Sequence, residues 1–156
     1  MGKKILIGIV VVFIVMQFIQ PAKNTSNEIP RTDFIVMNTP PSEVATILKT
    51  SCYDCHSNNT NYPWYGSVAP VSYILANHVN DGKKHLDFSR WGTYNQRQKE
   101  HILEEIREEV EERHMPLTSY INMHEEAAMT NDEIKTIIDW IDTSLSMTKL
   151  YNEPVQ

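Results

Sequence analysis

The feature that most constrains this chain is the run Cys52-Tyr53-Asp54-Cys55-His56, which contains both of its cysteines. Two thiols three positions apart on one turn of helix can each bond to one vinyl group of a haem. The histidine that follows then lies over the iron as an axial ligand. The pattern therefore predicts one covalently bound haem c, held by Cys52 and Cys55 and ligated by His56.

Three other interpretations of the two thiols are weaker. A disulfide between Cys52 and Cys55 would close a very short loop, which gives little stabilisation and strains the bond. A thioredoxin-like redox pair needs a βαβ setting, and no strand pattern surrounds the motif. A zinc site needs about four ligands, normally from two such pairs, and the sequence has no second pair.

An apolar run at residues 5–19 follows Lys3 and Lys4. As a helix, its fifteen residues span about 22 Å, against about 30 Å for a hydrocarbon core. Because residues 20–23 make a poor cleavage site, we expect a retained signal anchor at 1–20, with an N-terminal transmembrane helix, rather than a cleaved signal peptide. The two lysines predict an N-terminus inside the bacterial cytoplasmic membrane and a haem motif on the periplasmic, extracytoplasmic side.

Beyond this anchor the pattern predicts one small all-α domain. Residues 21–41 are polar and proline-rich and indicate an extended linker, residues 42–146 form the domain, and 147–156 form a frayed tail. Apolar residues at helical spacing predict helices at 42–51, from Ser67 to a stop at Asp81-Gly82, at 96–114, and from a capping box at Thr130 to about 145. We find no internal repeat and no strand.

Charge limits the class of partner. The formal net charge of −6 argues against a nucleic-acid binder. The helix at 96–114 carries seven glutamates, which most simply form a solvated face. The sharper alternative is a docking surface for basic redox partner proteins.

Aromatic and histidine side chains follow the motif closely. Trp64 and Tyr65 come soon after His56 and are expected to wall one edge of the porphyrin, although ordinary packing of the loop is compatible with the same pattern. His78 lies on or beside the apolar face of the next helix, where a packed histidine is commoner than an iron ligand.

The motifs together resemble a small single-haem cytochrome c and, more narrowly, the bacterial haem-binding domain family. The family's run is C-x-x-C-H-S-N, then Pro-Trp-Tyr, then Ala-Pro-Val with a downstream histidine. This chain has Cys52 to Asn58, Pro63-Trp64-Tyr65, and Ala69-Pro70-Val71 with His78. The resemblance covers nearly all of the part after the anchor and implies a cytochrome c-like haem domain, without implying peroxidase activity.

A sixth iron ligand is expected at Met115. It lies 59 residues after His56 (115 − 56), about the separation in the single-haem cytochromes that the domain resembles. Pro116 breaks the preceding helix and frees the side chain to turn toward the haem. The alternatives are His78, Met123 and Met129, or plain core packing of Met115.

The favoured function is an electron carrier rather than an enzyme: a membrane-anchored c-type cytochrome with both axial positions filled. The alternative is a haem-based sensor or haem enzyme subunit with an open or displaceable sixth position and a distal histidine such as His78, His85 or His114. A third hypothesis is a protein without haem that uses Cys52 and Cys55 in thiol exchange.

Overall fold

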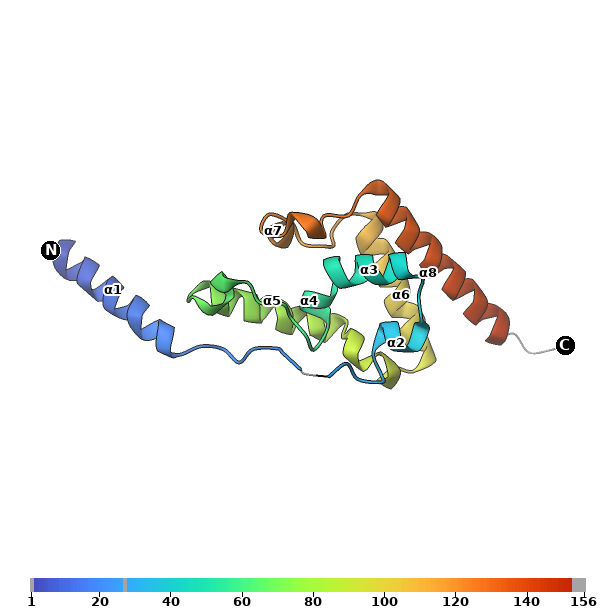
Figure 1. Ribbon diagram of the computed structural model, residues 1–156, viewed down its shortest axis with the longest axis horizontal. Helices are drawn as coiled ribbons and strands as arrows, with labels where there is room; N and C mark the ends of the chain where they lie inside the picture. Colours follow the sequence, from blue (N-terminus) through green and yellow to red (C-terminus); the bar gives the residue numbers. More distant parts are fainter. Residues whose placement is uncertain (1, 27, 153–156) are drawn as a thin grey trace.

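The computed structural model describes residues 2–26 and 28–152 of the 156-residue chain. The all-α prediction is confirmed, since the described part holds no strand beyond one isolated antiparallel bridge between Thr25 and Asn59. Figure 1 shows α1 at one end of the molecule and α8 at the other. In chain order the elements are α1 (Gly2–Phe18), α2 (Phe34–Asn38), α3 (Ser42–Ser51), α4 (Tyr53–His56), η1 (Trp64–Ser67), α5 (Val71–His85), η2 (Phe88–Thr93), α6 (Gln96–Glu111), α7 (Thr118–Ile121), η3 (Glu125–Ala127) and α8 (Asn131–Asn152).

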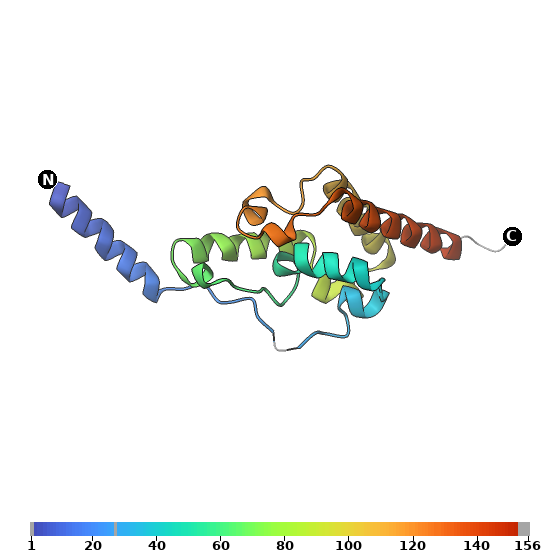
Figure 2. The ribbon, with the colours of Figure 1, turned by 45° about the horizontal axis from the view of Figure 1, so that its top comes forward.

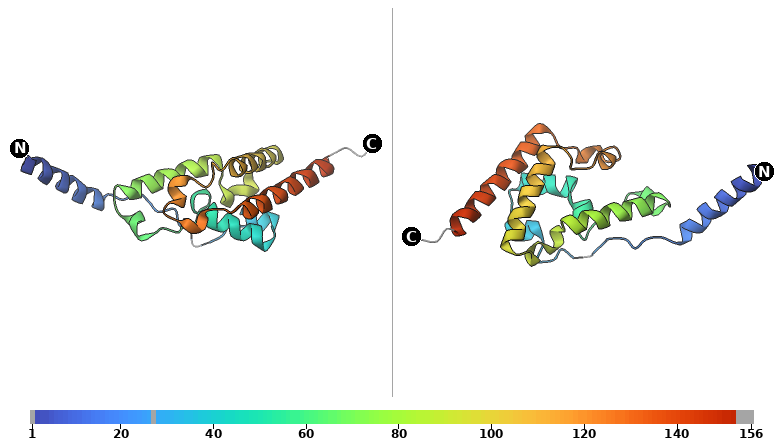
Figure 3. Two further views of the ribbon diagram at one scale, coloured as in Figure 1. Left: turned by 90° about the horizontal axis from the view of Figure 1, so that it is seen from above. Right: turned by 180° about the vertical axis from the view of Figure 1, so that it is seen from behind.

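The hydrophobic core lies between α3, α6 and α8, and α6 runs alongside α8 (Figure 3). An aromatic cluster from α2 and η2 closes its edge: the ring of Phe34 is 4.7 Å from Trp91 and 5.0 Å from Phe88, between centroids. The apolar stripes that the sequence predicted on α3, α6 and α8 are the faces that pack, whereas Val71 and Ile74 of α5 are exposed. The buried members of the three packed stripes are Val44, Ile47, Leu48, Ile102, Leu103, Val110, Ile137, Ile141 and Leu145.

The first helix differs from its prediction. Among the described residues, no helix combines the length and the apolarity needed to cross a membrane, so the transmembrane helix expected at 1–20 is not supported. The physical reason is length: α1 has 17 residues, or about 26 Å of helix against about 30 Å of hydrocarbon.

The segment 21–41 is more ordered than an extended linker. It contains α2, whose N-cap residue Asp33 is buried and accepts a hydrogen bond from the backbone N–H of Ile35 at 2.9 Å. The same carboxylate oxygen accepts a bond from the hydroxyl of Tyr53 at 3.0 Å. Because Tyr53 belongs to the C-x-x-C-H run, this part of the chain is fastened directly to the haem motif.

Four predicted helix ends also differ. α6 ends at Glu111 rather than at 114, because the backbone leaves the helical region at Arg113, whose φ is 58°. α5 begins at Val71 rather than Ser67, and it continues through Asp81-Gly82 to His85, because the missing side chain of Gly82 lets α4 pack against it. α8 continues through residue 147 to Asn152, since adding a residue to a formed helix costs little. The rest of the predicted tail, residues 153–156, lies outside the described residues.

Candidate haem site

The C-x-x-C-H run folds as one helical turn. α3 ends at Ser51, and the N–H groups of Cys55 and His56 both donate to the carbonyl of Cys52, at 3.2 and 3.1 Å. Cys55 and His56 lie on α4, and Cys52 is its N-cap residue, so the three side chains belong to residues of one helical turn. Both cysteines are free thiols, so the disulfide alternative is not realised.

His56 is held in one tautomer. Its Nδ1 lies 3.0 Å from the carbonyl oxygen of Leu86, and a carbonyl can only accept a hydrogen bond. Nδ1 therefore carries the proton of a neutral imidazole, and Nε2 carries its lone pair. The backbone of Gly82 is a second hydrogen-bond neighbour of this ring. Burial lowers the pKa of His56, which also favours the neutral form. A neutral imidazole with its lone pair on Nε2 is the form that ligates iron.

Gly82 sets how closely α5 approaches this turn. A Cβ at Gly82 would lie 3.1 Å from the carbonyl oxygen of Cys55 and 3.4 Å from Cε1 of His56. Glycine therefore allows a helix contact that any side chain would crowd. The local sequence predicts a helix stop at this glycine, because the contact depends on a partner 27 positions away (82 − 55).

The electrostatics of the thiols argue against exchange chemistry. Burial, with a contribution from Cys55, raises the pKa of Cys52 to about 12. Burial, with a contribution from Asp54, raises the pKa of Cys55 to about 11. Thiols that work in exchange have lowered pKa values, because the thiolate is the nucleophile.

A zinc site is also disfavoured. Across residues 2–26 and 28–152, no group of three or more His, Cys, Asp or Glu side chains is assembled to hold a metal ion. Structural zinc needs about four such ligands. The donor set of two thiols and one imidazole instead suits a porphyrin that brings four nitrogens of its own.

Exposed apolar side chains extend from the motif along α5. Val71, Ile74, His78 and Gly82 are spaced by three, four and four residues and so share one helix face. Ile74 is 53% exposed although it lies two turns from the motif. A porphyrin is a large apolar body that Val71 and Ile74 could cover, so the residues present fit a haem.

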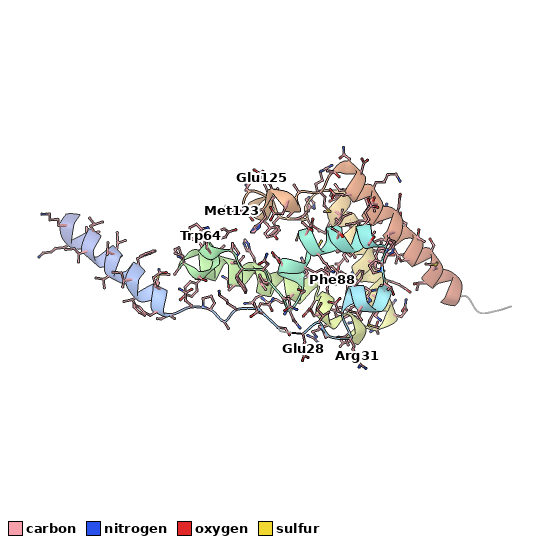
Figure 4. All side chains as sticks on the ribbon, in the orientation of Figure 1. Glu28, Arg31, Trp64, Phe88, Met123 and Glu125 are labelled. Carbon is pink, nitrogen blue, oxygen red and sulfur yellow. The ribbon has the colours of Figure 1, made fainter. Side chains whose placement is uncertain are left out.

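Further exposed apolar residues lie on the neighbouring segments. Trp64 of η1 is 82% exposed and Met123, just after α7, is 60% exposed. Figure 4 shows them on neighbouring segments at the same end of the domain, with Phe88 deeper inside it. The predicted Trp64 therefore lies beside this apolar region.

Residues 117–127, which we call the lid, are fastened to the motif by side chains. The hydroxyl of Tyr120 donates to Oδ2 of Asp54 at 2.9 Å. Nε2 of His124 lies 2.8 Å from the hydroxyl of Tyr65, and its ring stacks on Tyr120 with centroids 4.6 Å apart. In Figure 2 the lid, drawn in orange, lies over α4 and α5. Burial and then Asp54 raise the pKa of Tyr120, which keeps its hydroxyl a donor.

These lid residues were not predicted from the sequence. The available signal was the spacing of Tyr120 and His124, four positions apart and so on one face of a helical turn. Tyr65, expected to line the porphyrin edge, also serves as the hydrogen-bond partner of the lid.

The candidates for the sixth ligand occupy different settings. Met115 follows α6, where its N–H donates to the carbonyl of Glu109 at 3.1 Å, and its side chain is half-buried. His78 is half-buried on the α5 face described above. Met129 is buried in the core cluster, and Met123 lies in the exposed part of the lid. Of the four candidates, Met115 and His78 are the half-buried ones, and the choice among the four stays a prediction.

Comparison with known proteins supports a haem-binding domain. A family model described as a haem-binding domain matches residues 11–143. No curated protein and no solved structure matches the chain.

Proposed function

Because the chain belongs to the haem-binding domain family, we propose that it is a single-haem c-type cytochrome that transfers electrons outside the cytoplasm. The observation that carries the proposal is the arrangement on α4. Two free thiols lie on the same turn as a histidine whose Nδ1 is bonded to the Leu86 carbonyl and whose Nε2 carries the lone pair. Cys52 and Cys55 would form the thioether bonds, and His56 would be the fixed axial ligand.

The bound haem supplies one-electron redox chemistry, and this chain's residues set its conditions. The Leu86 carbonyl orients the His56 ring and increases its basicity. The apolar face of α5 with Val71 and Ile74 would exclude water from the site. The Tyr120–Asp54 bond holds the lid against the motif. An environment of this kind favours electron transfer over substrate binding.

Met115 is the proposed sixth ligand. Its position after α6, next to Pro116, gives the side chain a direction that a continuing helix would not allow. A thioether suits low-spin iron and raises the reduction potential. His78, Met123 and Met129 are the alternatives.

A haem-based sensor or haem enzyme subunit is the second candidate, and it requires the lid to open. Two side-chain bonds from the lid, Tyr120 to Asp54 and His124 to Tyr65, reach the elements around the motif. Opening of the lid would break these two bonds and withdraw any iron ligand that a lid residue supplies. An open sixth position beside His124 and Tyr65 would then have a proton donor at hand.

The place of action and the partner follow from other features. The C-x-x-C-H run and the apolar N-terminal run together support a haem domain on the periplasmic side of the cytoplasmic membrane. The exposed apolar side chains of α1 would associate it with the membrane. The acidic face of α6 would attract a basic redox protein, in a contact that weakens as salt is added.

The deciding experiment combines an optical spectrum with acid–acetone extraction of the purified protein. We expect the sharp reduced bands of a low-spin haem, and haem that stays with the protein because thioether bonds hold it. Cys52→Ala with Cys55→Ala should release the haem to the organic phase. A high-spin spectrum would favour the sensor, and a protein without haem would exclude both functions.

A further inference from the structure

Residues 23–26, which we call the strap, lie against the loop at residues 57–61 that follows the haem motif. Thr25 and Asn59 form the antiparallel bridge, and the N–H of Ser26 donates to Oδ1 of Asn59 at 2.8 Å. Figures 1 and 2 show this part of the chain running beneath α5 beside the loop. The sequence had indicated free linker at these positions.

Asn24 is the centre of the strap, because every polar group that it has is paired. Its N–H donates to the Tyr62 hydroxyl at 2.8 Å, and its carbonyl accepts from the N–H of Thr60 at 3.0 Å. Its Nδ2 donates to the carbonyl of Ser57 at 2.7 Å and to Oγ1 of Thr60 at 2.9 Å. Its Oδ1 accepts from Nζ of Lys83 at 2.9 Å.

One of these bonds leads directly to the motif. The Thr60 hydroxyl, which accepts from Asn24, donates to the carbonyl of Asp54 at 2.6 Å. Thr60 is buried, as is Ser57, the other acceptor of the Asn24 amide. Buried polar groups that lose a partner carry a desolvation penalty, so Asn24 is required to satisfy this part of the loop.

Lys83 ties the strap to α5 as well. Its Nζ donates to Asn24 and, at 2.5 Å, to Oδ1 of Asn58, and it lies 3.8 Å from the carboxylate of the buried Asp87. Lys83 follows Gly82, the contact point with α4, and precedes Leu86, the acceptor for His56. Asn24 is therefore bonded to the loop that follows His56 and, through Lys83, to the end of α5.

We propose that Asn24 is a positioning residue for the haem site, which holds the loop after His56 and the end of α5 in register from outside the motif. This proposal rests on the haem function proposed above. It also implies that the haem domain is not a freely swinging carrier on a tether. The end of α1 is fastened to the domain too, because the side-chain amide of Gln17 exchanges two hydrogen bonds with the backbone of Ala69, at 3.0 and 3.3 Å.

The test uses the full chain with Asn24→Ala. Its matched control is Asn38→Ala, which likewise removes an amide that donates to a backbone carbonyl, that of Phe34 at 2.9 Å, but within α2. We expect Asn24→Ala to keep its covalent haem while amide exchange of residues 57–61 becomes about tenfold faster, equivalent to about 1.4 kcal/mol of local opening. The midpoint potential should fall, because water reaching the site favours ferric iron. Asn38→Ala should change neither.

Thr60→Val provides an independent test, since it removes only the hydroxyl that links Asn24 to Asp54. It should lower the potential in the same direction, and the double variant should shift it no further than the larger single change. Faster exchange with an unchanged potential in both variants would show a purely structural strap and overturn the proposal.

A chain that carries no covalent haem would instead refute the proposed function while leaving the strap testable. The tautomer of His56 is then measured by ¹⁵N NMR. Asn24→Ala should change it from the Nδ1–H form alone to a mixture of the Nδ1–H and Nε2–H forms. A single unchanged tautomer in that variant would exclude a positioning role.

Discussion

Gly82 lies where α5 meets the C-x-x-C-H turn. A small substitution there should change the reduction potential of the haem more clearly than the free energy of unfolding. An added Cβ would lie 3.1 Å from the carbonyl oxygen of Cys55, against about 3.4 Å for an ordinary contact. In Gly82→Ala, α4 and α5 must therefore move apart by about 0.3 Å (3.4 − 3.1). A uniform shift of that size would stretch the His56–Leu86 bond from 3.0 Å to about 3.3 Å.

The expected stability change of the alanine variant is small, because two effects oppose each other. Alanine is favoured over glycine inside a helix by about 1 kcal/mol, and crowding a packed contact costs about 1–3 kcal/mol. We expect the free energy of unfolding of Gly82→Ala to lie between that of the parent and about 2 kcal/mol below it. Gly82→Val adds two methyl groups at the same point and should lose about 2 kcal/mol or more.

The midpoint potential of the haem should change in Gly82→Ala even if the stability does not. A longer bond to the Leu86 carbonyl makes the imidazole of His56 a weaker donor to iron, which stabilises the ferric form less. The midpoint potential of Gly82→Ala should therefore rise. Urea unfolding and redox titration of the same preparations measure the two effects.

Gly66→Ala is the matched control for this experiment. Its added Cβ would meet the side-chain atoms Leu75 Cδ2 at 3.1 Å, Tyr62 Cδ1 at 3.2 Å and Pro63 Cδ at 3.7 Å, and no atom of the motif. We expect its potential to change less than that of Gly82→Ala. If Gly82→Val unfolds like the parent and keeps the same potential, then α5 does not press on the motif and the reasoning is wrong.

Three further predictions follow from the same site. In protein lacking haem, alkylation of Cys55 should be about 100-fold slower at pH 8 than for an ordinary thiol, and should accelerate only as the pH approaches its pKa of about 11; equal rates would contradict the described burial. Tyr53→Phe should lower the free energy of unfolding by about 1–3 kcal/mol in urea titrations, because the buried Asp33 loses a hydrogen-bond donor; a change below about 0.5 kcal/mol would mean that water replaces the hydroxyl. Met115→Ala should abolish the weak near-infrared-edge absorption of a methionine–ferric bond and convert the haem to high spin or to a new ligand, whereas an unchanged ferric spectrum would exclude Met115.

The helices and the motif were predictable because their signals are local. Val44, Ile47 and Leu48 mark a buried face within two turns of α3, and these residues are buried in the structure. The capping box is equally local: the N–H of Glu133 donates to the hydroxyl of Thr130 at 3.2 Å, as the sequence predicted. Spacing alone also placed Cys52, Cys55 and His56 on one turn.

The partners of the motif were not predictable in this way. Tyr120 lies 66 residues from Asp54, and Leu86 lies 30 residues from His56. Nothing in the local pattern of a polar loop states which distant carboxylate or carbonyl it will face. Only the packing of the helices brings such groups within hydrogen-bond distance.

The strap shows why composition misleads most at such sites. A polar, proline-bounded stretch has the composition of a flexible linker, because polar side chains in water gain nothing by ordering. Asn24 differs only in what surrounds it: Ser57 and Thr60 are buried and need partners, and an asparagine amide can donate twice while its carbonyl accepts. The strap is thus ordered because the loop at residues 57–61 has buried polar groups that need its hydrogen bonds. A segment beside a cofactor motif is best judged by the unsatisfied groups of the motif's own loop rather than by the polarity of the segment.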